Sequence, residues 1–296
     1  MIYELILTRS RDLIQEFLSI PYGVTSLDLG LNELGSINNA ELIQAFANIP
    51  DSVTALDLAN NHLCDKNGAE LAQLLAAIPA NVTSLDLSCN NLDRRSGAEL
   101  AEAFAAIPSG VSSLNLHCNY LGNNRGVELA QAFAAIPENV TSLDLSMNYF
   151  DLESSNDLSQ IFTSIPPHVV SLNLSFNSLN EVPFEQFVLL KDSLKHVQTV
   201  YLSFYSVKEM SKEQRKALGS VFPNVQKIIL VDDYGHESQP SESVTISNLI
   251  REITGKANAP SLLNQCILFA QRHQTGCMER NIPEELKEDI RTFNSR

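Results

Sequence analysis

Hydrophobic and polar residues follow one pattern that returns along this chain at a nearly fixed distance. The pattern is Val-x-x-Leu-x-Leu-x-x-Asn-x-Leu; six copies follow one another at steps of 29 residues, and two looser copies follow at steps of 28. A fixed period of this size is typical of solenoids, in which each unit buries its apolar face against its neighbours. The copies begin at Val24, Val53, Val82, Val111, Val140, Val169, Val197 and Val225.

Each unit predicts a short strand followed by a helix. In the third unit, Leu85 and Leu87 alternate with polar residues, which is the period-two pattern of a half-buried strand. Ser96 and Glu99 then have the spacing of a helix capping box, and Pro108 ends the helix before the next strand. Because a helix is wider than a strand, the stack should curve, with a parallel sheet on the concave side and helices outside.

One asparagine stands at the same position of six consecutive units, where the chain turns away from the strand. An amide side chain there can bond backbone groups of neighbouring turns that no regular ladder reaches. We therefore predict a structural role for this column, which is Asn32, Asn61, Asn90, Asn119, Asn148 and Asn177.

The repeated pattern resembles the leucine-rich repeat, and the unit length with a full helix is similar to the ribonuclease-inhibitor type. This resemblance covers about residues 1–231. It implies an α/β fold, a horseshoe-shaped leucine-rich-repeat solenoid with a parallel concave β-sheet and convex helices.

The two ends of the chain depart from the pattern. Residues 1–23 are expected to form a shortened capping repeat, with Leu5 and Leu7 in its strand. About eight further strands follow up to residue 231, the last two with irregular loops. Residues 232–296 are expected to form a helical cap, or a small helical domain with its own function. We predict a polar linker over 235–243 and helices over about 244–255, 260–273 and 283–293.

Charge narrows the classes of partner. Residues 1–190 carry 22 acidic and 6 basic side chains, residues 191–231 carry 3 and 7, and residues 232–296 carry 10 and 7, which together give the net charge of −15. Such an excess of negative charge disfavours binding of nucleic acid and favours binding of a basic partner. A need for solubility alone would also explain the negative charge. The chain shows no secretory signal peptide and no membrane-spanning stretch, so we expect a soluble protein.

The sequence offers little chemistry for catalysis. It contains none of the common phosphate-binding, serine-hydrolase or metalloprotease motifs, so we expect no enzyme and no cofactor. Cys89 and Cys118 occupy equivalent positions of adjacent units, with His117 beside them. A metal site would need more ligands in a convergent geometry, so we interpret the pair as two small packing residues. A labile disulfide under oxidation is a subsidiary prediction, which an unchanged thiol count would contradict.

The concave face provides the candidate partner-binding site. Between the two strand leucines stand mostly aspartates and asparagines, and three positions later the side chains become larger and more apolar. Exposed aromatic groups beside charges are typical of interface hot spots. Repeat duplication could also explain the acids, and adjoining loops could cover the aromatic groups. The predicted site consists of Asp86, Asp144 and Asn173 as polar contacts and of Met147, Phe176, Tyr201 and Phe204 as anchors, with Tyr149 close to Phe176 and Tyr201.

A basic group lies in the last units. Lys208, Lys212, Arg215 and Lys216 are expected to share mostly one face of a helix over 211–221. A solvated helix face is one interpretation, and docking of an acidic partner or an anionic membrane surface is the other. No aromatic residues are interleaved, which speaks against nucleic acid.

The C-terminal acidic block at residues 284–289 is explained by helix N-terminal charge alone. It also resembles the C-terminal signals of proteins that intracellular bacterial pathogens export by type IV secretion. The recurring Val-Thr-Ser-Leu-Asp-Leu and Ile-Pro sequences of the repeats resemble those of leucine-rich-repeat effectors of such bacteria. The leading hypothesis is therefore a translocated bacterial effector that binds a host protein in the host cytoplasm through its concave face. A regulator of a small GTPase or other enzyme, and an adaptor or ligase-recruiting role of the C-terminal helices, are the alternatives.

Overall fold

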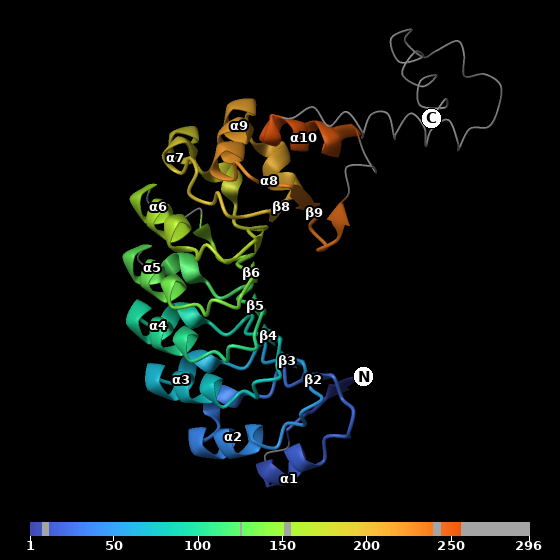
Figure 1. Ribbon diagram of the computed structural model, residues 1–296. Coiled ribbons are helices and arrows are strands. Elements are labelled where there is room, and N and C mark those ends of the chain that lie inside the picture. Colours follow the sequence, from blue (N-terminus) through green and yellow to red (C-terminus); the bar gives the residue numbers. More distant parts are fainter. Residues whose placement is uncertain (8–11, 125, 151–154, 239–243, 256–296) are drawn as a thin grey trace, which may run out of the picture.

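The computed structural model describes residues 1–7, 12–124, 126–150, 155–238 and 244–255 of the chain. Successive units stack into an arc, with the strands along its inner side and the longer helices along its outer side (Figure 1). This is the α/β leucine-rich-repeat solenoid that the periodic pattern predicts.

One open sheet of ten strands forms the concave face, and its strands lie in the order of the sequence. Strands β1 to β9 are parallel, whereas β10 runs antiparallel to β9. Equivalent residues pair in register, so Leu56 pairs with Leu27 and with Leu85. The strands are β1 Ile2–Glu4, β2 Ser26–Asp28, β3 Ala55–Asp57, β4 Ser84–Asp86, β5 Ser113–Asn115, β6 Ser142–Asp144, β7 Ser171–Asn173, β8 Thr199–Ser203, β9 Lys227–Val231 and β10 Glu237–Ser238.

Most units carry an outer helix, and several carry a short 3-10 helix where the chain leaves the strand. Capping boxes start α3 and α4, as the Ser96–Glu99 spacing predicts. The α-helices are α1 Leu13–Leu18, α2 Asn39–Phe46, α3 Gly68–Ala76, α4 Gly97–Ala105, α5 Gly126–Ala134, α6 Ser155–Ser164, α7 Phe184–Leu189, α8 Phe204–Glu209, α9 Lys212–Val221 and α10 Val244–Thr254. The 3-10 helices are η1 Leu34–Ser36, η2 Leu63–Asp65, η3 Leu92–Arg94, η4 Leu121–Asn123 and η6 Leu179–Glu181.

A single apolar core runs through the arc between the sheet and the helices. The strand leucines and the helix phenylalanines of successive units, such as Leu114, Phe104 and Phe133, are almost fully buried in it. Because every unit buries its apolar face against the next one, the stack has no internal boundary over these turns.

The asparagine column has the structural role that we predicted. The buried Asn90 donates to the carbonyl oxygens of Leu58 and Leu87 at 3.0 Å, and its Oδ1 accepts from the backbone N–H of Asn61 at 3.0 Å. Each such side chain thus joins backbone groups of two successive turns that lie beyond the sheet ladder.

The first unit differs from the prediction in its register. Tyr3, and not Leu5, pairs with Leu27 at the first leucine position of the strand. Leu5 follows as the buried second position, and Leu7 lies beyond the strand, where its N–H donates to the Asn32 side chain. The predicted strand at Leu5 and Leu7 was therefore two residues out, because an aromatic residue fills the place of the usual leucine.

The last units differ more strongly. Strand β8 runs directly into helix α8, where we predicted an irregular loop. Within the predicted linker, Glu237 and Ser238 form β10, which pairs with Val231 and Leu230. A turn makes this reversal possible: Gly235 has a φ of +82°, and the Asp232 carboxylate accepts from backbone N–H groups of the turn.

The predicted basic helix face is wrong in one essential residue. Arg215 of α9 is buried, and its Nε donates to the Glu252 carboxylate of α10 at 2.6 Å. Its Nη1 donates to the carbonyl oxygens of Val207, Lys208 and Met210 at the end of α8. Lys208 lies on α8, so of the four predicted basic residues only Lys212 and Lys216 lie exposed on α9.

Helix α10 lies against α9 at the end of the stack (Figure 1). Its apolar residues Ile246, Leu249, Ile250 and Ile253 belong to the continuous core. The other two predicted helices, over 260–273 and 283–293, lie outside the described residues. None of the helices in the described part of the chain has both the length and the apolar character that crossing a membrane requires.

Candidate partner-binding surface

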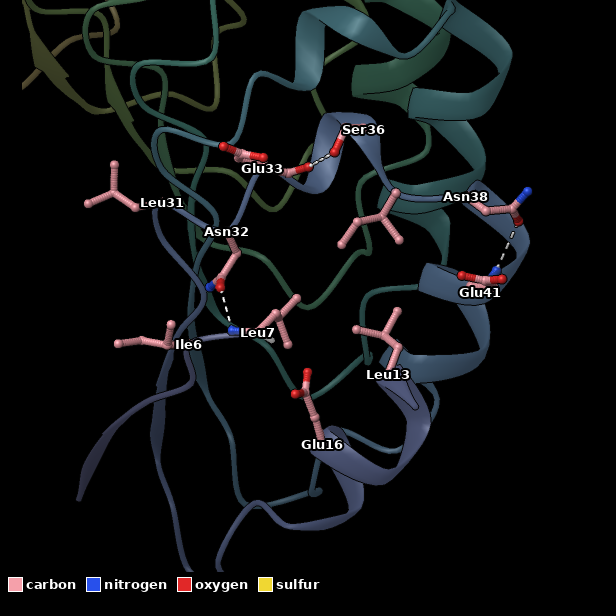
Figure 2. Close-up of a pocket in the computed structure, with 11 residues that line it drawn as sticks. Ile6, Leu7, Leu13, Glu16, Leu31, Asn32, Glu33, Ser36, Asn38 and Glu41 are labelled. Carbon is pink, nitrogen blue, oxygen red and sulfur yellow. Dashed lines mark hydrogen bonds between the residues drawn. The ribbon is translucent and has the colours of Figure 1, made fainter. Parts of the chain in front are cut away.

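A cavity lies at the N-terminal end, between the first two turns. It measures about 660 Å³, and Figure 2 shows apolar Ile6, Leu7 and Leu13 beside the carboxylates of Glu16 and Glu41. Residues 8–11, which are not described, join two of these lining residues. The candidate site lies instead on the concave sheet, in a groove that all of the units from β4 to β8 line.

A groove of about 420 Å³ follows the concave face of strands β4 to β8. The turn between β9 and β10 closes one of its ends. We call this region the concave groove, and its lining residues are Ser84, Leu85, Asp86, Ser113, Leu114, Asn115, Ser142, Leu143, Asp144, Ser171, Asn173, Tyr201, Val231, Gly235 and Glu237. Three of them are carboxylates, and none of them is a lysine or arginine.

The aspartate and asparagine column of the groove stabilises the turns that follow the strands. The Oδ1 atom of each residue accepts from the backbone N–H two positions later, for instance from Ser88 onto Asp86 at 2.7 Å and from Ser175 onto Asn173 at 3.0 Å. Such a turn accepts either side chain, since both offer a carbonyl-type oxygen. The turn therefore explains why the column holds aspartate or asparagine, but it does not explain the charge.

Two asparagine amides neutralise part of the repulsion within the column. Asn115 Nδ2 donates to Asp86 Oδ2 at 2.7 Å, and Asn173 Nδ2 donates to Asp144 Oδ2 at 2.7 Å. The groove is thus a row of alternating carboxylates and amides, whose orientation these bonds fix before any partner arrives. Such preorganised groups lose little conformational entropy when a partner binds.

Tyr201 stands at the end of this row, beside Asn173 in the sheet. Burial raises the pKa of its phenol, and the carboxylates of Glu237 and Asp144 raise it further. The hydroxyl therefore stays protonated at neutral pH, and an aromatic ring with a hydrogen-bond donor borders the acidic floor. Such a side chain is suited to anchor a partner.

The groove unites four of the seven predicted site residues, namely Asp86, Asp144, Asn173 and Tyr201. The three others lie outside it. Met147 is 39 % exposed beyond the strand end, Phe176 is half-buried against the loop side of the core, and Phe204 is the first residue of α8 and packs partly against the core.

The aromatic cluster that we expected is also divided. Of Tyr149, Phe176 and Tyr201, only Tyr201 lines the groove. Tyr149 instead stacks on Tyr120 of the preceding unit, with ring centroids 5.6 Å apart. The column that grows more apolar along the stack therefore belongs to the turns after the strands and not to the concave surface.

Two kinds of groove residue were not predicted from the sequence. The serines that begin the strands, among them Ser113 and Ser142, line the groove beside the acids. Their recurrence in four successive units, from Ser84 to Ser171, was a visible signal of a second polar column. Glu237 gave no such signal, because its position depends on the chain reversal that forms β10.

Asp57 provides a test of the charge in this column. Burial raises the pKa of its carboxyl, the Ala59 amide lowers it, and the neighbouring Asp86 and Asp28 raise it. A raised pKa means that the folded chain binds this proton more tightly than the unfolded chain does. The ionised carboxylate therefore destabilises the fold at neutral pH, and this penalty is lost as pH falls through the raised pKa.

We expect Asp57→Asn to stabilise the protein at pH 7 by about 0.5 kcal/mol, in the range of cross-strand like-charge pairs. Asparagine keeps the turn, as Asn115 and Asn173 do. Urea unfolding at pH 7 and at acid pH measures the effect, which should shrink on acidification. The exposed Asp51→Asn is the control for net charge; an equal gain from both variants would contradict the explanation.

Comparison with known proteins places these features in a family. No protein-family model matches the chain, and no curated protein matches it. Among solved structures, the leucine-rich repeat-containing protein LegL7 from Legionella pneumophila is 45 % identical, with a TM-score of 0.57, over 88 % of this chain and 100 % of that one. The tropomodulin C-terminal domain from Caenorhabditis elegans is 12 % identical, with a TM-score of 0.32, over 54 % of this chain and 93 % of that one.

Proposed function

The chain is a leucine-rich repeat protein, and we propose that it acts as an interaction module whose concave groove binds a basic segment of a protein partner. The observation that carries this proposal is the composition of the groove. It presents Asp86, Asp144 and Glu237, and no lysine or arginine occurs among its described lining residues. Carboxylates arranged in this way attract lysine or arginine side chains and disfavour acidic partners.

The contacts within the groove suggest how recognition would work. The Asp86 and Asp144 carboxylates are held in place by backbone and asparagine donors, and Ser146 Oγ also donates to Asp144 Oδ1. Both Asp86 oxygens and Asp144 Oδ2 retain further acceptor capacity. The serine hydroxyls beside them can bond the backbone of an extended segment. Tyr201 supplies the aromatic anchor at the end of the row. Hydrogen bonds to the partner would then lie beside one larger contact, which the Tyr201 ring makes.

We place the activity of the protein in binding and not in catalysis. The groove is an open, preorganised surface, and its two aspartates accept hydrogen bonds from the turns that follow their strands. Leucine-rich-repeat folds typically serve as interaction scaffolds, which agrees with this placement.

We further propose that the protein is an effector that a bacterium exports by type IV secretion to act on a host protein. The likeness to a Legionella pneumophila leucine-rich repeat protein supports this, as does the acidic block at residues 284–289. A reporter fused to the N-terminus should reach the host cytoplasm only from bacteria with a working secretion system. Equal delivery from a secretion-deficient strain would contradict the proposal.

The groove is tested with Asp86→Asn combined with Asp144→Asn. Both changes remove a charge and leave the turn intact, because asparagine already makes this turn at two positions of the column. Capture of a basic partner from host-cell lysate should weaken at least about tenfold, as for charged interface contacts.

The matched control combines Asp28→Asn with Asp57→Asn. These residues belong to the same column and carry the same charge, but they do not line the groove. Capture should be retained by this control. A similar loss in both double variants would assign the effect to net charge and would contradict a specific groove.

A further inference from the structure

Three metal-ligating side chains converge just outside the concave groove. A ligand atom of Cys89, one of His117 and one of Cys118 all lie within 4.8 Å of one another. They come from the turns that follow β4 and β5, and all three side chains are only half-buried. From the sequence we interpreted the two cysteines beside His117 as packing residues, because a metal site needs ligands in a convergent geometry, and the structure shows that the three ligand atoms converge.

The repeat architecture creates this convergence. Cys89 and Cys118 hold the same position in successive units, with φ values of 55° and 54°, so their side chains leave the backbone in the same direction. The N–H of Cys89 donates to the carbonyl oxygen of His117 at 2.9 Å, which fixes the two turns side by side. A tetrahedral ion with metal–sulfur bonds of about 2.3 Å would hold two sulfur atoms about 3.7 Å apart, so a small movement suffices.

The hydrogen bonds of His117 favour a ring tautomer that suits metal binding. Ser146 Oγ donates its single hydrogen to Asp144 Oδ1 at 2.5 Å, so it must accept from His117 Nδ1, which lies 2.8 Å away. This leaves the lone pair on Nε2. A ligating histidine that donates its other N–H to a carboxylate or similar acceptor is the usual arrangement around bound metals, and here a buried serine relays the contact.

Packing alone does not account for the two cysteines. Other units place Leu31, Asn60, Met147 and Phe176 at the same position, so the stack accepts side chains of very different size and polarity there. The Cys89 and Cys118 sulfur atoms lie within 4.8 Å of each other. Two thiols this close would repel each other as thiolates, and a divalent cation would compensate that charge.

We propose that Cys89, His117 and Cys118 form a binding site for Zn²⁺, with three protein ligands and a fourth position open to water or to a group of the partner. Two thiolates and one imidazole are a ligand set that zinc prefers, and three protein ligands with an open position are typical of accessible zinc sites.

The test uses the full chain with Cys64, Cys266 and Cys277 changed to serine, so that Cys89 and Cys118 are its only thiols. With the thiols kept reduced, Co²⁺ should bind one ion per chain and give a thiolate charge-transfer band with tetrahedral visible absorption. Zn²⁺ should displace Co²⁺ and abolish both signals. A folded chain with two free thiols and no such band would overturn the proposal.

Variants assign the ligands. Cys89→Ser, Cys118→Ser and His117→Ala should each weaken Zn²⁺ binding more than about 100-fold, measured by competition with a chromophoric chelator and with folding checked by circular dichroism. Ser146→Ala should keep the Co²⁺ band but weaken binding about 10–100-fold, because it removes the contact that orients His117. Unchanged affinity in His117→Ala would overturn the three-ligand site.

Discussion

Replacement of Asn90 by alanine should destabilise the solenoid by about 4 kcal/mol, more than any exposed substitution in the same unit. The Asn90 side chain is completely buried. Its Nδ2 donates to three backbone carbonyl oxygens, those of Leu58, Leu87 and Ser88, at 3.0 to 3.1 Å. Its Oδ1 accepts from the backbone N–H groups of Asn61 and Leu63 at 3.0 and 3.2 Å.

The expected loss follows from what the deletion leaves behind. Alanine removes one side chain but leaves five backbone groups near it, in an interior that water does not reach. A buried polar group without a partner costs about 1–3 kcal/mol, and some of these groups retain other bonds. The side chain also joins two turns of the stack, so its removal weakens the coupling between neighbours on which solenoid cooperativity depends.

Urea unfolding followed by circular dichroism measures the loss, and amide hydrogen exchange locates it. Asn123→Ala is the matched control, because Asn123 is exposed and makes a single side-chain bond to Asp93 at 3.1 Å. It should change the unfolding free energy by less than about 0.5 kcal/mol. Equal urea midpoints for the two variants would refute the structural role of the asparagine column.

The asparagine column also shows what the sequence could predict. Asn90 recurs at a fixed interval, and a recurring polar residue in an apolar pattern must satisfy the same backbone groups in every turn. The paired strands, the outer helices and the capping box at Ser96 follow from the same local rules. Repetition made these predictions reliable, because each unit tests the assignment of the others.

The unpredicted parts depend on contacts between elements that do not repeat. Arg215 has the spacing of an exposed helix face, and only the approach of α8 and α10 buries it. Glu237 enters the groove because the chain reverses after β9. Phe204 was expected on the concave surface, but a helix begins there once the turn asparagine is absent. Tertiary contacts at the end of the stack decide these positions, and no periodic pattern encodes them.

Arg215→Met is expected to release α10 from the end of the stack. Methionine retains much of the apolar stem of arginine but cannot replace its hydrogen bonds. The change leaves Glu252 without its cation and the carbonyl oxygens of Val207, Lys208 and Met210 without their shared donor. Removing one partner of a largely buried ion pair costs about 3–5 kcal/mol, and the partial exposure of Glu252 places the expected value near the lower end.

Because turns of a solenoid contact only their neighbours, the damage should stay local. Hydrogen exchange should accelerate over α8, α9 and α10, while α3 and α4 keep their protection. Arg251→Met, which removes an exposed arginine of α10 itself, is the control and should leave exchange unchanged.

Gly219→Ala gives an independent test of the same contact. A Cβ atom at Gly219 would lie 1.7 Å from the carbonyl oxygen of Ile253, so α10 could not keep its place on α9. This variant leaves Arg215 intact and should reproduce the local loss of protection. If exchange in α10 is unaffected by both variants, then α10 does not depend on α9 for its structure, and the end of the apolar core must be covered in another way.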